Sequence, residues 1–258
     1  MNRRTEKTGR NGSSASKCRL GMFVSIPHPS TVEVAALLGF SFVILDNEQI
    51  VTDATTYRSM ILAAQKHNID TLVRLGKGSA DRFMAFLGMG AKGILVPGLK
   101  TMDEVREAVR MAKYPPDGVR GLGHSPATGF GLTKGWKELI PLLNKDVKVH
   151  IIVETKELLD RVEELAKEPG VDAIDIGQLD LSVSLGTPCD FNSDVMRDAF
   201  DRIVKAGISA GRPVNCACSS VEDARRFFER GLEGIILDSS FLIGEGVKPY
   251  LQLLHGGK

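Results

Sequence analysis

The segment Ser41-Phe-Val-Ile-Leu45 is the clearest structural signal in the chain, because four apolar residues follow one another without a break. Unbroken apolarity is typical of a parallel β-strand that is buried on both faces. Downstream, Tyr57, Met60, Ile61 and Ala64 are apolar at spacings of three and four, which predicts a helix with one buried face. A buried strand followed by a covering helix is the repeating unit of α/β proteins.

This strand–helix unit recurs eight times, which matches a parallel barrel of typically about 250 residues. A doubly wound open sheet is the alternative, but it usually carries a glycine-rich turn after its first strand, and Ile26-Pro-His-Pro-Ser30 is not such a turn. The sequence therefore predicts one (β/α)8 TIM barrel, of the α/β class, over residues 18–258. The predicted strands are Leu20–Ile26, Ser41–Leu45, Thr71–Arg74, Gly93–Val96, Lys148–Val153, Val171–Ile176, Pro213–Asn215 and Gly234–Leu237.

Two helix starts show the capping-box pattern, in which a hydroxyl residue is followed three positions later by a glutamate. They are Ser30 with Glu33, and Thr101 with Glu104. The segment from Tyr114 to Lys134 contains three prolines and five glycines, so it is predicted to be a long loop.

The composition is that of an ordinary globular enzyme, with 43% hydrophobic residues, 25% charged residues and a net charge of +1. A nucleic-acid-binding protein usually has a clear basic excess, so this class is not expected. Residues 1–17 are basic and have no apolar core, which predicts a disordered tail and not a secretory signal. No segment approaches the roughly 20 apolar residues of a membrane span, and we expect a cytoplasmic protein without membrane contact.

The four cysteines are Cys18, Cys189, Cys216 and Cys218. Zinc ribbons and redox motifs need two residues between paired cysteines and a second ligand pair, and this spacing is missing here. We expect buried free thiols in a reducing compartment.

Barrel enzymes carry out their chemistry at the carboxyl ends of the strands and in the loops that follow. The polar residues predicted at these positions are His28, Asp46, Glu48, Gln49, Arg74, Arg120, His124, Glu154, Asp180 and Asp238. A single aspartate after a strand is more often a helix cap than a catalyst, but so many polar residues at one end favour a functional site.

Glu154 and Asp180 follow neighbouring strands, so their carboxylates can approach each other. Two carboxylates completed by water and substrate oxygens form a typical Mg²⁺ or Mn²⁺ site, and the alternative is a salt bridge to a nearby lysine or arginine. Arg74 can clamp a substrate carboxylate, or it can be a structural partner of Asp46 or Glu48. A Schiff-base mechanism is disfavoured, because no lysine stands deep in the predicted barrel.

At this point the chain resembles a known family, the HpcH/HpaI-type class II aldolases, over nearly its whole length after the tail. The Tyr-Pro-Pro and Asp-Leu-Ser runs are the most specific of the similar segments. Those segments are Leu45-Asp-Asn-Glu48, Leu72-Val-Arg74, Ile94-Leu-Val-Pro97, Tyr114-Pro-Pro-Asp-Gly-Val-Arg-Gly-Leu-Gly123, Val153-Glu-Thr155 and Asp180-Leu-Ser182.

The resemblance implies a (β/α)8 barrel, usually a hexamer, whose last helix is exchanged between subunits. It implies a divalent metal ion, Mg²⁺, Mn²⁺ or another, held by Glu154 and Asp180, and a 2-oxo acid whose carboxylate is held by Arg74. It further places Glu48 among the catalytic residues. Contacts to the substrate are expected from Gln49, Gly177 and Gln178.

The sequence departs from the family in its acid–base residues. Family aldolases have a histidine where this chain has Gln49, and an aspartate where it has Gly88. A neutral amide cannot carry a proton near pH 7. Two histidines appear instead near the predicted barrel mouth, His28 and His124, and we consider both as catalytic candidates. The alternatives are a turn residue between two prolines for His28 and an ordinary surface-loop residue for His124.

The siderophore-associated citrate synthases, an offshoot of this family, show the same kind of loss. The resemblance therefore favours condensation of oxaloacetate with acetyl-CoA in siderophore biosynthesis. One alternative is a class II retro-aldolase of 4-hydroxy-2-oxo acids, or an oxaloacetate decarboxylase, with a relocated base. A third is a protein that binds a 2-oxo acid without turnover. No Gly-x-x-x-x-Gly-Lys-Ser/Thr loop marks a nucleotide site, so the sequence does not identify the acceptor.

Overall fold

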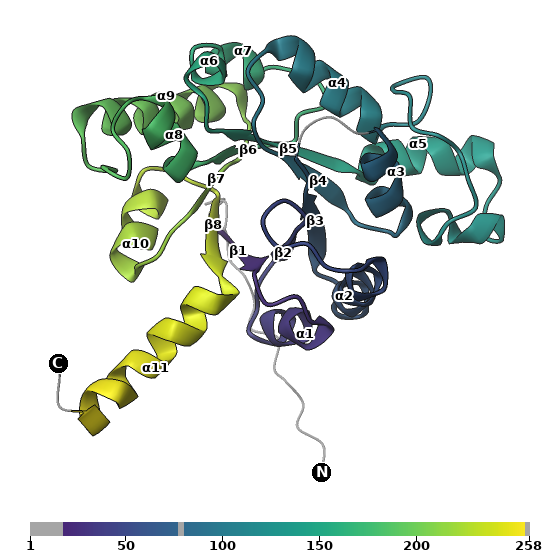
Figure 1. Cartoon of the computed structure of the whole chain (residues 1–258). Coiled ribbons are helices and arrows are strands. Elements are labelled where there is room, and N and C mark those ends of the chain that lie inside the picture. Colours follow the sequence, from purple (N-terminus) through teal and green to yellow (C-terminus); the bar gives the residue numbers. More distant parts are fainter. Residues whose placement is uncertain (1–17, 77–79, 256–258) are drawn as a thin grey trace, which may run out of the picture.

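The computed structural model describes residues 18–76 and 80–255, so the predicted tail at residues 1–17 lies outside the described part. Eight strands form a closed barrel in which every strand is parallel to its neighbours and β8 pairs with β1 (Figure 1). The predicted (β/α)8 barrel is confirmed. The strands are β1 (Arg19–Val24), β2 (Phe42–Asp46), β3 (Asp70–Arg74), β4 (Gly93–Val96), β5 (Lys148–Val153), β6 (Ala173–Ile176), β7 (Val214–Ala217) and β8 (Gly234–Asp238).

Helices surround the barrel and connect its strands (Figure 1). In the described residues, no helix has the length and apolarity that crossing a membrane requires. The helices are α1 (Pro29–Leu37), α2 (Ala54–His67), α3 (Ala80–Gly88), α4 (Met102–Ala112), the 3₁₀ helix η1 (Pro126–Gly131), α5 (Trp136–Asp146), α6 (Lys156–Leu159), α7 (Val162–Leu165), α8 (Gln178–Ser184), α9 (Asp194–Ala210), α10 (Val221–Glu229) and α11 (Ser239–His255).

Two helix starts show how local chemistry sets the boundaries. The capping box of Thr101 and Glu104 is present at the start of α4, as predicted. The one predicted at Ser30 is wrong, because α1 begins one residue earlier, at Pro29. There His28 is the N-cap, and its Nδ1 accepts a hydrogen bond from the Ser30 backbone N–H at 3.2 Å. Proline suits the first helical position because it has no N–H to satisfy.

The core has two layers, as strand alternation in a barrel requires. Outward-facing strand residues such as Val43, Leu45 and Val73 pack against the helices. Inward-facing residues fill the barrel interior, and they form a separate apolar cluster. That cluster consists of Phe42, Ile44, Leu72, Leu95, Ile152 and Ile236.

Three polar residues share the barrel interior with this apolar cluster: His150 of β5, Asp175 of β6 and Asn215 of β7, all buried. The Nδ1 atom of His150 lies 3.0 Å from Oδ2 of Asp175. The Asn215 amide donates to both carboxylate oxygens of Asp175 at 3.3 Å. We call these three residues the interior polar cluster.

The sequence prediction misses one helix and overstates the burial of the cysteines. Helix α5 follows the predicted loop, in a segment for which the sequence predicts no element. All four cysteines are free thiols, as predicted, but only Cys216 is buried and Cys189 is exposed.

The last helix, α11, leaves the barrel instead of lying along it, and Figure 1 shows it projecting outward from the end of β8. Its first residues contact β1 and β8. Further along, apolar side chains recur at helical spacing and are exposed to solvent. They are Ile243, Val247, Tyr250, Leu251 and Leu254, with exposed fractions from 43% to 73%.

Candidate active site

A cavity of about 560 Å³ opens at the carboxyl ends of the strands, where the barrel fold predicts chemistry. Five residues that the sequence predicts for the site line this main cavity: Arg74, Glu154, Gly177, Gln178 and Asp180. Their positions follow from the fold, since they stand at or just after the ends of β3, β5 and β6. The volume is in the usual range for small-molecule sites.

Arg74 forms a two-pronged ion pair with Asp46, the last residue of the neighbouring strand β2. Its Nε and Nη2 atoms lie 2.9 and 2.7 Å from the two carboxylate oxygens of Asp46. The guanidinium also lies over the ring of Phe23, 5.0 Å from the centroid. Arg74 is therefore fixed in place, while its Nη1 atom has no hydrogen-bond partner among the described residues and remains available to a ligand.

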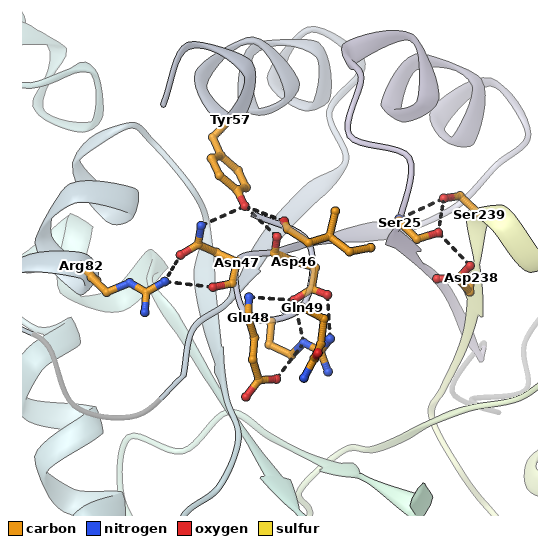
Figure 2. Close-up of polar contacts among 11 residues, drawn as sticks. Ser25, Asp46, Asn47, Glu48, Gln49, Tyr57, Arg82, Asp238 and Ser239 are labelled. Atoms are coloured by element: carbon orange, nitrogen blue, oxygen red, sulfur yellow. Dashed lines mark hydrogen bonds and ion pairs between the residues drawn. The ribbon is translucent and has the colours of Figure 1, made fainter. Parts of the chain in front are cut away.

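The Asp46 carboxylate also holds the start of the loop after β2 (Figure 2). Its Oδ1 accepts the backbone N–H groups of Glu48 and Gln49 at 3.0 and 3.3 Å. Burial alone would raise the pKa of Asp46, but the hydrogen bonds from Arg74 and this loop outweigh it and lower the pKa. Asp46 is therefore an ionised partner of Arg74 at neutral pH.

Glu48 contributes a second carboxylate beside Arg74. Its Oε2 lies 3.4 Å from the Arg74 Nε, although Glu48 does not itself line the main cavity. Burial raises the pKa of Glu48, and repulsion from Asp46 and Asp180 adds to the rise against the attraction of Arg74. Arg74 is thus both a structural partner of Asp46 and Glu48 and a residue exposed to the cavity.

A network behind Asp46 fastens the loop to the helices (Figure 2). The Tyr57 hydroxyl of α2 donates to the backbone carbonyl of Asp46 at 2.7 Å, and it accepts from the Asn47 amide at 2.9 Å. From α3, the Arg82 guanidinium donates to the backbone carbonyl of Asn47 at 2.9 Å and also contacts its side-chain oxygen. The position of Arg74 therefore depends on two helices as well as on β2.

Glu154 follows β5, and burial raises the pKa of its carboxyl to about 7. The backbone N–H of Gly98, which donates to Oε1 at 2.5 Å, opposes this rise, and repulsion from Asp180 and Glu48 adds to it. Gly177 faces the same carboxylate across the β5–β6 edge. A methyl group on Gly177 would lie 2.9 Å from Oε2 of Glu154, so glycine leaves space for this oxygen and for anything bound to it.

Asp180 lies in the first turn of α8 and is exposed at the cavity wall. Within residues 18–76 and 80–255, its carboxylate has neither a hydrogen bond nor an ion pair. The described residues contain no group of three or more histidine, cysteine or acidic side chains that could hold a metal ion. Two converging carboxylates with a free oxygen each still fit a divalent ion of the Mg²⁺ kind, which takes only one or two protein carboxylates and completes its shell with water and substrate.

A third group of polar side chains lies at the cavity wall between β8 and β1 (Figure 2). Oδ1 of Asp238 accepts the hydroxyls of Ser25 and Ser240 at 2.8 and 2.6 Å, and the backbone N–H groups of Ser240 and Phe241. The Ser239 hydroxyl in turn accepts the Ser25 backbone N–H at 3.0 Å. Asp238 is thus the cap of α11 and part of the cavity wall at once.

The two candidate histidines do not line the main cavity. His28 is exposed and serves as the N-cap of α1. His124 is also exposed, and its ring stacks on Trp136 of α5, with centroids 5.8 Å apart. Gln49 and Gly88, at the positions of the family's acid–base pair, do not line the cavity either.

Asp175 lines the cavity, although it is absent from the predicted site. Its signal in the sequence is an acidic residue inside the otherwise apolar run Ala173-Ile-Asp-Ile176. His150 and Asn215 interrupt β5 and β7 in the same way. A polar residue inside a buried strand needs a hydrogen-bond partner. Here His150 and Asn215 are both partners of Asp175.

Comparison with known proteins agrees with this geometry. The sequence model of the family described as HpcH/HpaI aldolase/citrate lyase matches residues 19–240. The chain is 26% identical over 227 residues, 88% of each chain, to the 5-keto-4-deoxy-D-glucarate aldolase of Shigella sonnei strain Ss046.

Two solved structures are similar to this barrel over nearly their full length. The citrate synthase SbnG is 27% identical, with a TM-score of 0.82 over 93% of this chain and 94% of that one. A HpcH/HpaI aldolase/citrate lyase family protein from Burkholderia cenocepacia J2315 is 26% identical, with a TM-score of 0.87 over 94% and 96%. The chain therefore belongs to the HpcH/HpaI aldolase/citrate lyase family and is an enzyme of the type that makes or breaks carbon–carbon bonds.

Proposed function

We propose that this enzyme binds a 2-oxo acid through a divalent metal ion and Arg74, and makes or breaks a carbon–carbon bond next to the oxo group. The observation that carries the proposal is the convergence of Glu154, Asp180 and Arg74 on one cavity. Two carboxylates and a guanidinium are the groups that a chelated 2-oxo acid requires, because the metal ion needs anionic ligands and the substrate carboxylate needs a cation.

Glu154 and Asp180 are the residues that would hold the metal ion, which we propose to be Mg²⁺ or Mn²⁺. When bound, such an ion polarises the ketone of the substrate. Arg74 has already committed Nε and Nη2 to Asp46, so its remaining N–H groups would orient the substrate carboxylate. Asp46 and Glu48 keep the guanidinium aligned, which is the role we propose for Glu48.

The acid–base group is to be sought among residues other than those that bind the metal ion and the substrate carboxylate. No histidine, lysine or tyrosine belongs to the main-cavity lining in the described part of the chain. His28 and His124 stay predictions from the sequence. Their role would require that loops rearrange, or that a second subunit brings them to the cavity.

The favoured reaction is condensation of oxaloacetate with acetyl-CoA to give citrate, as in siderophore biosynthesis. The structural similarity to the citrate synthase SbnG supports it. The second candidate is aldol cleavage of a 4-hydroxy-2-oxo acid, or decarboxylation of oxaloacetate. The similarity to 5-keto-4-deoxy-D-glucarate aldolases supports this one.

The assembly proposed for this chain is a homo-oligomer, a hexamer by resemblance, with α11 exchanged between subunits. The exposed apolar stripe along α11 supports this, because exposed side chains such as Ile243, Tyr250 and Leu254 are normally covered by a partner. A second copy of the chain can cover the stripe on each subunit in turn, which a closed ring allows.

The test is a substrate screen on protein stripped with EDTA and reloaded with Mg²⁺ or Mn²⁺. Citrate and free CoA from oxaloacetate plus acetyl-CoA support the favoured reaction. Pyruvate released without CoA supports the second candidate, and ligand-induced thermal stabilisation without turnover in either assay contradicts both. Glu154→Gln is expected to abolish metal-dependent turnover. The matched control Glu157→Gln, an exposed glutamate on α6, keeps it.

A further inference from the structure

A second cavity of about 170 Å³ adjoins the main cavity. The two cavities are adjacent, because they share five wall residues, Gln178, Phe191, Asn192, Arg226 and Phe227. The residues that line the smaller one belong to α8, α9 and α10 or lie next to these helices in sequence. We call it the arginine cavity, because Arg197 and Arg230 line it together with Arg226.

The three arginines line this cavity. The aspartates that pair with them do not, although Asp223 lines the adjoining main cavity. Arg226 donates to Asp223 at 2.7 Å, within α10. Arg197 pairs with Asp194, whose side chain is 88% exposed. Exposed ion pairs of this kind contribute little stability, so a ligand with a stronger negative charge can recruit the guanidinium groups.

Arg230 is paired with Asp201 of α9, which is 64% exposed and likewise outside the cavity lining. A cavity with cations inside and acids outside is suited to an anion. Arginine binds carboxylate and phosphate groups through two parallel N–H bonds, and a phosphate group can accept such bonds from several arginines at once.

Two buried aromatic rings support two of these cations. The rings of Phe200 and Phe227 stack with centroids 5.0 Å apart. Arg230 lies over the Phe200 ring at 4.5 Å, and Arg226 lies 5.5 Å from the centroid of Phe227. Rings beneath the guanidinium groups restrict the directions in which their N–H groups point.

We propose that the arginine cavity binds a phosphate group of the acceptor substrate, and that the acceptor is an acyl-CoA. In this arrangement the phosphates lie among Arg197, Arg226 and Arg230, and the uncharged arm passes Phe191 and Asn192 into the main cavity. The acyl group then reaches the 2-oxo acid at Glu154 and Asp180. The assignment rests on the proposed function for the identity of the reaction, but phosphate binding does not depend on turnover.

Equilibrium binding of CoA to the full-length protein tests the assignment, because it needs no catalysis. Arg197→Gln and Arg226→Gln are each expected to raise the Kd for CoA about tenfold, the loss of one charge-assisted hydrogen-bonded contact. Arg197→Lys keeps the positive charge but lacks the two parallel N–H donors, so its Kd for CoA is expected to lie between those of the parent and Arg197→Gln. Each Gln variant is also expected to weaken the salt dependence of binding. The matched control is Arg202→Gln, on the same helix as Arg197 but paired with Glu163 outside both cavities, and it is expected to change the Kd less than about twofold.

The possible outcomes separate this inference from the proposed function. Equal Kd values for CoA in Arg197→Gln, Arg226→Gln and Arg202→Gln, with unchanged melting temperatures, overturn the arginine cavity as a phosphate site. Binding of inorganic phosphate or a phosphorylated aldehyde, but not of CoA, overturns the acyl-CoA assignment. CoA binding that follows the predicted order, in an enzyme that does not turn over oxaloacetate, supports the site and contradicts the citrate reaction.

Discussion

The barrel contains two clusters of polar side chains that differ in how completely they are satisfied. At the mouth, Arg74 keeps donors free after pairing with Asp46, and Asp180 has no partner in the described chain. Deeper inside, His150 and Asn215 both bond to Asp175, and all three are buried. The difference indicates which cluster serves a ligand and which serves the fold: polar groups left with spare hydrogen bonds need a partner from outside.

The largest effect is expected from removing Arg74. Arg74→Met leaves the Asp46 carboxylate buried without its counter-ion, which costs about 3 kcal/mol of unfolding free energy. It also removes the carboxylate clamp, so kcat/KM is expected to fall at least about 100-fold. Urea unfolding and steady-state kinetics measure the two losses.

A second substitution separates these two effects of Arg74. Arg74→Met combined with Asp46→Asn is expected to recover most of the stability, because the buried anion is gone. It is not expected to recover activity. If the double variant is as unstable as the single one, the Asp46–Arg74 pair does not stabilise this end of the barrel.

In the interior polar cluster the expected effect is on stability alone. His150→Leu leaves Asp175 with only the Asn215 amide and is expected to cost about 2 kcal/mol. His150→Gln keeps a donor and is expected to cost about half of that. The substrate Kd is expected to change less than about twofold in both, since His150 does not line the cavity. A large loss of substrate affinity in His150→Leu would assign this cluster to the active site.

Glu154 makes the cluster at the barrel mouth sensitive to pH. Its folded-state pKa is about 7 against an ordinary value of 4.5, so between these pH values the native state keeps a proton that the unfolded state has released. Stability of the metal-free protein therefore falls as pH rises through this window. After allowance for solvent screening, Glu154→Gln is expected to be more stable than the parent by about 1–2 kcal/mol above pH 7, and equal to it below pH 4.5.

Thermal or urea unfolding across pH 4.5 to 8 measures this difference. The exposed control Glu157→Gln is not expected to gain stability over the same interval. A constant difference between Glu154→Gln and the parent at every pH would show that folding does not raise the pKa of Glu154.

The smallest effect is expected from a substitution that fills the space beside Glu154. Gly177→Ala places a methyl group 2.8 Å from Cβ and 2.9 Å from Oε2 of Glu154, so the carboxylate must move. We expect metal affinity to fall about tenfold, the usual scale for a disturbed ligand orientation, measurable by Mn²⁺ titration. Gly135→Ala is the control, because its φ is −69° and a methyl group there meets open space.

The sequence predicts the eight strands because several are short apolar runs, as burial on both faces requires, and because strands and helices alternate regularly. It also predicts that Arg74, Glu154 and Asp180 share a cavity, since parallel strands end at the same face. It does not predict α5. The prolines and glycines before Trp136 indicate a loop, and the helix starts only after them.

The role of isolated polar residues is harder to infer, since it depends on contacts between distant segments. In the sequence, His28 is predicted to lie near the barrel mouth. In the structure, the hydrogen bond that it accepts from the Ser30 N–H makes it a helix cap. Conversely, His150 and Asp175 are 25 residues apart and become partners only because β5 and β6 are neighbours. Arg197 of α9 and Arg226 of α10 are likewise distant in the sequence but line one cavity.

Asp238 connects helix α11 with the wall of the main cavity. One carboxylate oxygen fixes the first turn of α11 and the Ser25 hydroxyl, and Ser25 and Asp238 both belong to the wall of the main cavity. The position of α11 and the shape of the cavity are therefore thermodynamically linked. An interaction that fixes α11 in one orientation changes the ligand affinity of the cavity by some factor. Ligand binding then changes the strength of that interaction by the same factor.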